Sequence, residues 1–141
     1  MATDPATREA VRAVLEEFRA AVAAQDVERL LEVYAPDADV VGIGTAADEW
    51  YVGRDSMREG FQRDFADGAP FVVEFAPPII SSAGDVAWLA AGFNGRMSTS
   101  GGQVRLHGRF TAVLRREGGR WRIVQAHTSL PAGEPDAETY E

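Results

Sequence analysis

The stretch 109–129 constrains the fold most, because it predicts two long strands joined by a tight turn. Apolar and polar residues alternate before the turn, and Gly118-Gly119 supplies the flexible pair typical of a short β-hairpin. Side chains two residues apart lie on one face of a strand. One such row of the second strand begins apolar and ends polar, and consists of Trp121, Ile123, Gln125, His127 and Ser129. This row predicts one wall of a small-molecule pocket.

Length and charge narrow the class of protein. A chain of 141 residues predicts one domain with a substantial core. The net charge is −8, and the basic residues, all of them arginine, are scattered among acids. Nucleic-acid binding needs clustered cations, so this composition argues against it. The absence of lysine also excludes Schiff-base chemistry on that residue.

Metal and thiol chemistry have little support in the sequence. The chain has no cysteine, which excludes disulfides and thiolate nucleophiles. Its two histidines, His107 and His127, lack the spacing of metal ligands, so we expect neither a metal nor another cofactor. The first ten residues lack the apolar run of a signal peptide, and no segment is apolar for long enough to cross a bilayer. We therefore expect a soluble cytoplasmic protein that binds neither membranes nor nucleic acid.

Three helices are predicted in the first half of the chain. The first begins at Asp4-Pro5, a capping residue followed by proline, and its apolar residues then repeat at helical spacing. A short second helix is predicted over 26–35, between a capping aspartate and a proline. A third is predicted over 54–65, after a short hairpin.

The second half predicts strands. They cover 71–80, with a break at Pro77-Pro78, and then 86–97, 103–116 and 120–130. The order of elements predicts an α+β fold, in which three N-terminal helices pack on a strongly curved, mainly antiparallel sheet.

The chain is expected to form a single domain over residues 1–131. Residues 132–141 are mostly acidic or small, which predicts a disordered tail.

A second apolar face predicts self-association. If Arg109 and Thr111 face the cavity, the opposite row of the same strand lies on the convex face of the sheet. That row consists of Leu106, Phe110, Ala112 and Leu114. A large apolar surface is unfavourable in water, so we expect a second copy of the chain to cover this convex face in a homodimer.

Four segments resemble the SnoaL-like branch of the nuclear-transport-factor-2-like (NTF2-like) superfamily, also described as cystatin-like α+β cones. They are 26–41, 53–57, 109–111 and 119–129. The resemblance implies a cone-shaped cavity beneath the helices and usually a dimer. Known activities include ketosteroid isomerase, polyketide cyclase, scytalone dehydratase and epoxide hydrolase, and the fold also serves as an oligomerisation domain of a calmodulin-dependent kinase.

The resemblance does not select one of these activities. Steroid isomerases of the family carry an aspartate base on the strand where this chain aligns Gly42, and Asp39 is the nearby alternative. SnoaL-like cyclases pair a histidine with an aspartate on the late strands. Here His127 has Gln125 on its own strand and no carboxylate.

His127 is the leading candidate for acid–base catalysis, because imidazole exchanges a proton near neutral pH. The alternative is a histidine that bonds across the sheet within the core. Arg109 is expected to bind a carboxylate or stabilise an oxyanion, or else to lie exposed. The other expected ligand contacts, of which the aromatic ones have a purely structural alternative, are Tyr34, Trp50, Phe61, Trp88, Thr111 and Gln125.

These features predict a SnoaL-like protein with an apolar cone pocket. We expect cofactor-independent chemistry of the isomerase, cyclase or dehydratase type on a hydrophobic carbonyl or polycyclic small molecule. His127 would move the proton, and Arg109, Gln125 or Tyr34 would polarise the carbonyl. Two alternatives stay open: a non-catalytic protein that binds an apolar ligand, and a dimeric assembly module.

Overall fold

The computed structural model describes residues 3–68 and 71–132. Within them the elements follow in the order α1 (Pro5–Ala24), α2 (Val27–Val33), β1 (Val41–Ile43), β2 (Trp50–Val52), α3 (Arg54–Asp67), β3 (Phe71–Phe75), β4 (Ile79–Ala83), β5 (Val86–Thr99), β6 (Gly102–Glu117) and β7 (Arg120–Ser129). The expected tail, 132–141, lies outside the described residues except for Ala132.

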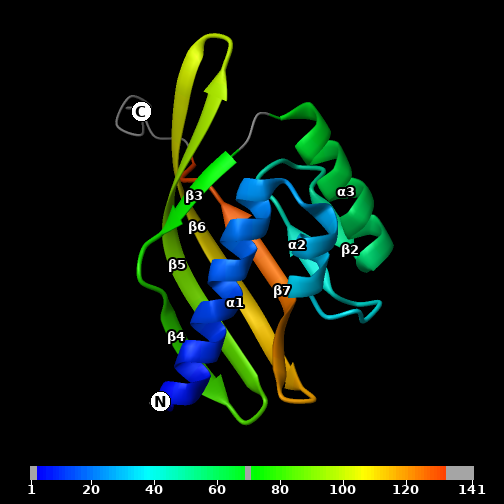
Figure 1. Ribbon diagram of the computed structural model, residues 1–141, viewed down its shortest axis with the longest axis vertical. Coiled ribbons are helices and arrows are strands. Elements are labelled where there is room, and N and C mark those ends of the chain that lie inside the picture. The colour runs from blue at the N-terminus through cyan, green and yellow to red at the C-terminus, as the bar shows by residue number, and fades with distance from the viewer. Residues whose placement is uncertain (1–2, 69–70, 133–141) are drawn as a thin grey trace.

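The strands form one sheet in the order β2-β1-β7-β6-β5-β3, and β4 also pairs with β5. The strands β1 and β7 run parallel, and the other printed pairs are antiparallel. Figure 1 shows α1 crossing one face of the sheet, with α2 and α3 beside it, and the β5–β6 hairpin extending beyond the helices. The predicted α+β architecture, three helices on a mainly antiparallel sheet, is confirmed.

The ends of the first two helices follow from local chemistry. The Asp4 carboxylate accepts a hydrogen bond from the Thr7 N–H at 2.9 Å, and Pro5 occupies the first turn. Helix α1 ends at Gln25, whose φ of 52° is left-handed. Asp26 then caps α2 by accepting from the Arg29 N–H at 3.1 Å. None of the described helices is long and apolar enough to cross a membrane.

A β-bulge in β7 decides which side chains face the helices. Leu114 of β6 pairs with Ile123, whereas the adjacent Val113 pairs with Gln125, so Val124 is an extra residue in β7. Ile123 is buried beneath the helices, and the next buried residue is Ala126. One inserted residue moves every later side chain to the opposite face. The expectation of one uninterrupted row from Trp121 to Ser129 was therefore wrong.

The two faces of β6 are also reversed from the expectation. Thr111 pairs with His127 and Arg109 with Ser129, and these side chains share the outer, convex face. Phe110, the largest fully buried residue of the core, faces the helices together with Ala112 and Leu114. The apolar row that was expected on the convex face is thus the inner row of the sheet.

Candidate functional site

A cavity of about 310 Å³ lies between the helices and the inner face of the sheet. Small-molecule pockets commonly measure from about 300 to 1,000 Å³, so this one suits a compact ligand. Its walls come from all three helices, from β1 and β2, and from the inner rows of β3, β5, β6 and β7.

Phenylalanine rings form one apolar wall. Phe110 of β6 lies with its ring centroid 4.9 Å from that of Phe18 on α1 and 5.5 Å from that of Phe75 on β3. Phe93 of β5 extends the group, 6.0 Å from Phe75. All four rings line the cavity, so this wall offers dispersion contacts to an apolar molecule.

Tyr34 supplies a polar group within these apolar surroundings. Its side chain lines the cavity beside Phe61, with ring centroids 6.0 Å apart, and the residue is only 4% exposed. Its hydroxyl has no hydrogen-bond partner among the described residues. Burial raises the pKa of the Tyr34 phenol, so the group stays protonated at neutral pH and can donate to a ligand oxygen.

A second tyrosine also contacts Phe61. The ring of Tyr51 on β2 meets Phe61 edge-on, with centroids 6.2 Å apart. Helix α3 approaches this ring closely because residue 60 is glycine: a Cβ on Gly60 would lie 2.5 Å from the Tyr51 Cζ. The Tyr51 hydroxyl accepts a hydrogen bond from Arg63 at 3.0 Å.

Polar side chains gather where the cavity opens to solvent. Asp64 of α3 is exposed, and Glu49 of the β1–β2 loop is half-buried. One Glu49 carboxylate oxygen accepts from the Ala46 N–H at 2.7 Å, which fixes the loop. The Gln25 amide reaches across from the end of α1 to the carbonyl oxygens of Phe65 and Gly68, at 3.4 and 3.5 Å.

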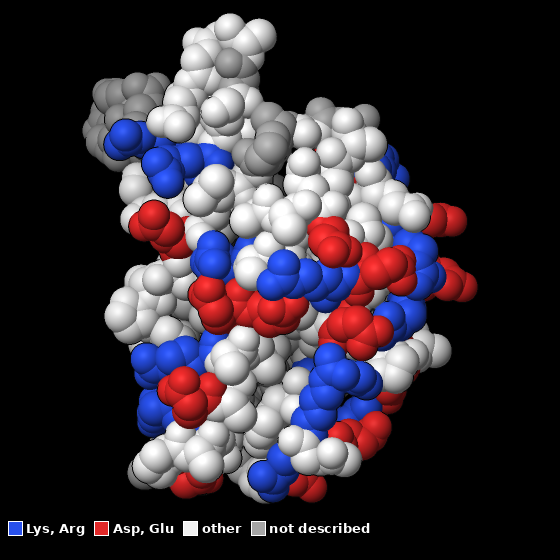
Figure 2. Space-filling view, viewed as in Figure 1, with Lys and Arg blue, Asp and Glu red and all other residues white. Residues whose placement is uncertain are grey.

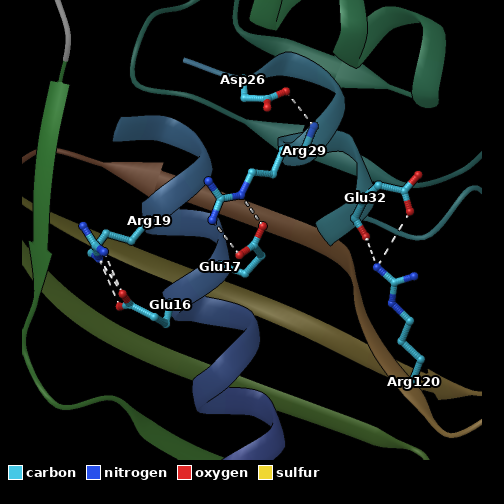
Figure 3. Close-up of polar contacts among 7 residues, drawn as sticks. All are labelled: Glu16, Glu17, Arg19, Asp26, Arg29, Glu32 and Arg120. Carbon is cyan, nitrogen blue, oxygen red and sulfur yellow. Dashed lines mark hydrogen bonds and ion pairs between the residues drawn. The ribbon is translucent and has the colours of Figure 1, made fainter. Parts of the chain in front are cut away.

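Contacts of arginine side chains outside the cavity hold α2, the helix that directly precedes Tyr34. The Arg29 guanidinium donates to Glu17 of α1 at 2.6 Å, and the Arg120 guanidinium at the start of β7 donates to the Glu32 carbonyl at 3.1 Å (Figure 3). Exposed pairs add little stability each, so their main effect is to orient α2. Figure 2 shows the same mixture of positive and negative side chains over the helical face.

Two of the eight residues predicted for the site, Tyr34 and Phe61, line the cavity. Gln125, His127 and Thr111 instead lie on the outer face, where they border a shallow pocket of about 270 Å³ together with Trp88. The expectation that these polar groups face into the cone was wrong. The bulge turns Gln125 and His127 of β7 outward, and Thr111 of β6 pairs with His127 on the same face.

The two other predicted residues are also on the outside. Arg109 is exposed, and its guanidinium donates to the Ser129 hydroxyl at 3.2 Å and to the Leu130 carbonyl at 3.4 Å. Trp50 on β2 is 63% exposed. The catalytic roles of His127 and Arg109 remain predictions. Neither residue lines the cavity.

Three polar residues of the opening were missed. Asp64 follows Phe61 by three residues in a predicted helix, so its place on the same face was a usable signal. Gln25 lies at a helix end and Glu49 lies in a loop. In such places the spacing of apolar residues does not predict which way a side chain points. Within 3–68 and 71–132, no group of three or more His, Asp or Glu side chains has the arrangement of a metal site.

The profile of the SnoaL-like domain family matches residues 11–133. No curated protein sequence matches this chain. Among solved structures, a proposed dehydratase of the NTF2-like family from Streptomyces avermitilis is 19% identical, with a TM-score of 0.81 over 92% of this chain and 100% of the other. A proposed aromatic ring hydroxylase from Novosphingobium aromaticivorans is 20% identical, with a TM-score of 0.83 over 94% of both chains.

A third similar structure has a name that refers to association. It is a proposed association domain of a calcium/calmodulin-dependent protein kinase II from Xanthomonas campestris, 22% identical, with a TM-score of 0.78 over 94% of this chain and 95% of the other. At these identities the likeness establishes a common fold and leaves activity open.

Proposed function

We propose a function for the cavity from the premise that the chain belongs to the family of SnoaL-like domains. The cavity binds a compact apolar molecule, and the Tyr34 hydroxyl donates a hydrogen bond to an oxygen of that molecule. The Tyr34 hydroxyl carries the proposal: it belongs to a buried side chain that lines the cavity, and it has no hydrogen-bond partner among the described residues. A hydroxyl that faces an apolar cavity without a protein partner gains free energy when a ligand supplies the acceptor. A hydrophobic ketone or ester has the required chemistry.

Two naphthalenes of nearly equal shape test this proposal by calorimetry. Acetylnaphthalene carries a carbonyl acceptor, and ethylnaphthalene substituted at the same carbon carries none. The wild-type protein should bind the ketone about tenfold more tightly, which corresponds to one hydrogen bond to an otherwise unpaired group. Tyr34→Phe should remove this preference and leave binding of the hydrocarbon unchanged. Equal affinities for both compounds in the wild-type protein would contradict the proposal.

A second candidate function is proton transfer next to that carbonyl. Glu49 lines the same cavity as Tyr34, so the chain supplies a carboxylate base and a hydroxyl that stabilises the developing oxyanion. Glu49 would then be the acid–base group, the role that the sequence analysis gave to His127. The expected reaction class is still isomerisation or dehydration.

Hydrogen exchange separates this enzyme from a binding protein. In deuterated water, a catalyst would speed deuterium incorporation into the methyl group of acetylnaphthalene, and Glu49→Gln would abolish the acceleration. Exchange at the uncatalysed rate would rule out proton abstraction from this ketone and leave ligand binding as the function.

The outer face of the sheet supports the further proposal of a homodimer. Trp50, Ile79 and Trp88 are 63%, 75% and 40% exposed, although each is large and apolar. Strand pairing sets Trp50 beside Ile43 and Ile79 beside Ala90, with Thr111 and His127 between them. Such a band of exposed apolar side chains, interrupted here by Thr111 and His127, is typical of an interface between two copies.

A further inference from the structure

We propose that the acidic segment 133–141 of the chain binds a group of arginines on the outer face of the sheet, near the base of the β5–β6 hairpin. This arginine patch consists of Arg96, Arg105 and Arg109. Two observations carry the proposal: two of the arginines lie directly opposite each other in an acidic chain, and the acidic segment begins beside the third. The patch is separate from the cavity and independent of the proposed ligand binding.

Strand pairing places the three arginines on one face of the sheet. Arg96 of β5 pairs with Arg105 of β6, and Arg109 follows four residues later on β6. Phe110 is buried beneath the helices, so the alternate, exposed residues Arg105 and Arg109 point to the outer face. Four residues of a strand span about 14 Å, which is the length of the patch. Figure 2 shows positive side chains at the base of the projecting hairpin.

The pairing of Arg96 with Arg105 is unfavourable by itself, because like charges directly opposite each other on two strands repel. Glu74 of β3 lies 3.9 Å from the Arg96 guanidinium and offsets part of the charge. Arg105 makes no ion pair with any residue of 3–68 and 71–132. His107, on the same face of β6, contacts the Asn94 side chain. The patch therefore keeps a surplus of positive charge, within a chain whose total charge is −8.

The acidic segment begins next to this patch. Strand β7 ends at Ser129, which pairs with Arg109, and the Arg109 guanidinium donates to the Ser129 hydroxyl at 3.2 Å and to the Leu130 carbonyl at 3.4 Å. Because β7 is antiparallel to β6, it runs toward Arg105 and the hairpin. Segment 133–141 contains no arginine, and its acids are Glu134, Asp136, Glu138 and Glu141.

The distance suits a contact within one chain. An extended chain covers about 3.3 Å per residue, so Glu134 can reach about 13 Å from Leu130, nearly the length of the patch. The tether gives the acids a high effective concentration at the arginines. Pro131 and Pro135 lack the N–H that pairing with β6 would use, so we infer contact through side-chain charges. Such contact needs no fixed fold, which is compatible with the disordered tail expected from the sequence.

A spin label on the acidic segment tests the proposal by nuclear magnetic resonance. The chain has no cysteine, so Thr139→Cys takes a single nitroxide label and keeps all four acids. At low salt the label should broaden the amide signals of residues 94–96 and 103–109. About 1 M salt, which screens charges beyond about 3 Å, should reduce the broadening at least about twofold. Broadening that salt leaves unchanged would show that the tether alone keeps the segment nearby, and would overturn the proposal.

Charge variants of the labelled protein locate the contact. Arg105→Gln at low salt should reduce the broadening roughly twofold, and Glu134→Gln combined with Asp136→Asn should do the same. Arg12→Gln removes the same charge from an exposed site on α1, which covers the opposite face of the sheet, and should have no effect. An equal loss with Arg12→Gln would assign the attraction to the net charge of the chain and overturn the role of the patch.

A mixed sample shows which copy supplies the segment. Isotope-labelled protein without the nitroxide is combined with nitroxide-labelled protein that carries no isotope, so only broadening between copies is detected. This broadening should be much weaker than that within the doubly labelled protein. Broadening of equal size would place the segment on a second copy and overturn contact within one chain.

Discussion

Phe18 of α1 packs against Phe110 of β6, with ring centroids 4.9 Å apart and ring planes inclined by 42°. The contact joins the longest helix to the middle of the sheet. Both rings also line the cavity. The residues that stabilise the fold are therefore partly those that shape the site.

Shortening Phe110 should destabilise the protein strongly. The residue is 2% exposed, so Phe110→Ala should lower the free energy of unfolding by about 3–5 kcal/mol, and Phe110→Leu by about 1–2 kcal/mol. Urea unfolding followed by circular dichroism measures both. A loss below about 1 kcal/mol for the alanine variant would show that this ring is not part of the stabilising core.

Gln25 should respond differently to two small replacements. Its φ of 52° favours glycine, so Gln25→Gly relieves backbone strain worth about 1 kcal/mol but loses the side-chain amide contacts, and it should leave the free energy of unfolding roughly unchanged. Gln25→Ala keeps the backbone strain and loses the amide contacts to Phe65 and Gly68, so it should lose about 1 kcal/mol. Thermal unfolding of the two variants side by side measures the difference. Equal stabilities of the two variants would show that the left-handed backbone conformation at residue 25 does not matter.

Asp37 should make the protein more sensitive to acid. The hydrogen bonds from Arg115, at 3.0 Å to each carboxylate oxygen, lower the pKa of Asp37 in the folded state. A lowered folded pKa stabilises the protein above the unfolded pKa, and this contribution is lost as pH falls through the folded value. Asp37→Asn should therefore be less stable than wild type at about pH 7, and the gap should narrow below about pH 4.

Urea unfolding at several pH values, from about pH 7 to well below about pH 4, measures the gap. Glu9→Gln is the control for removal of a negative charge, and its difference from wild type should stay small throughout. A gap for Asp37→Asn that is constant over the whole range would contradict the role of the Asp37–Arg115 pair.

The outer face should mediate dimerisation. Sedimentation velocity at micromolar concentration should give a dimer for the wild-type chain and a monomer for Trp88→Arg, because the variant buries a charge in the apolar band. Val104→Arg introduces the same charge on the β5–β6 hairpin, outside the band, and should remain dimeric. A wild-type monomer, or a dimer that Trp88→Arg leaves intact, would refute this interface.

The sequence predicted the elements well because their signals are local. The Asp4 cap, the proline after α2 and the Gly118-Gly119 turn act through neighbouring residues, and both glycines have the positive φ that such a turn requires. The apolar spacing of Tyr34 and Phe61 likewise placed both on the inner side of their elements.

The alternation of apolar and polar residues could not predict which face of the sheet the later side chains of β7 lie on. The bulge at Val124 leaves Trp121 and Ile123 inside and turns Gln125 and His127 outside. No residue type marks the extra residue of a bulge, because the bulge is defined only by how β7 pairs with β6. The opening of the cavity was missed for a similar reason, because Glu49 lies in a loop whose position depends on the rest of the fold.

The central claim is that the ligand lies inside the cone and not on the outer face. Two alanine methyl groups report on the two sides: Ala126 of β7 lines the cavity, and Ala90 of β5 lines the outer pocket. In a nuclear magnetic resonance titration with acetylnaphthalene, the account predicts that the Ala126 methyl signal shifts with saturation and the Ala90 signal stays in place. A saturable shift of Ala90 with Ala126 unmoved would contradict it.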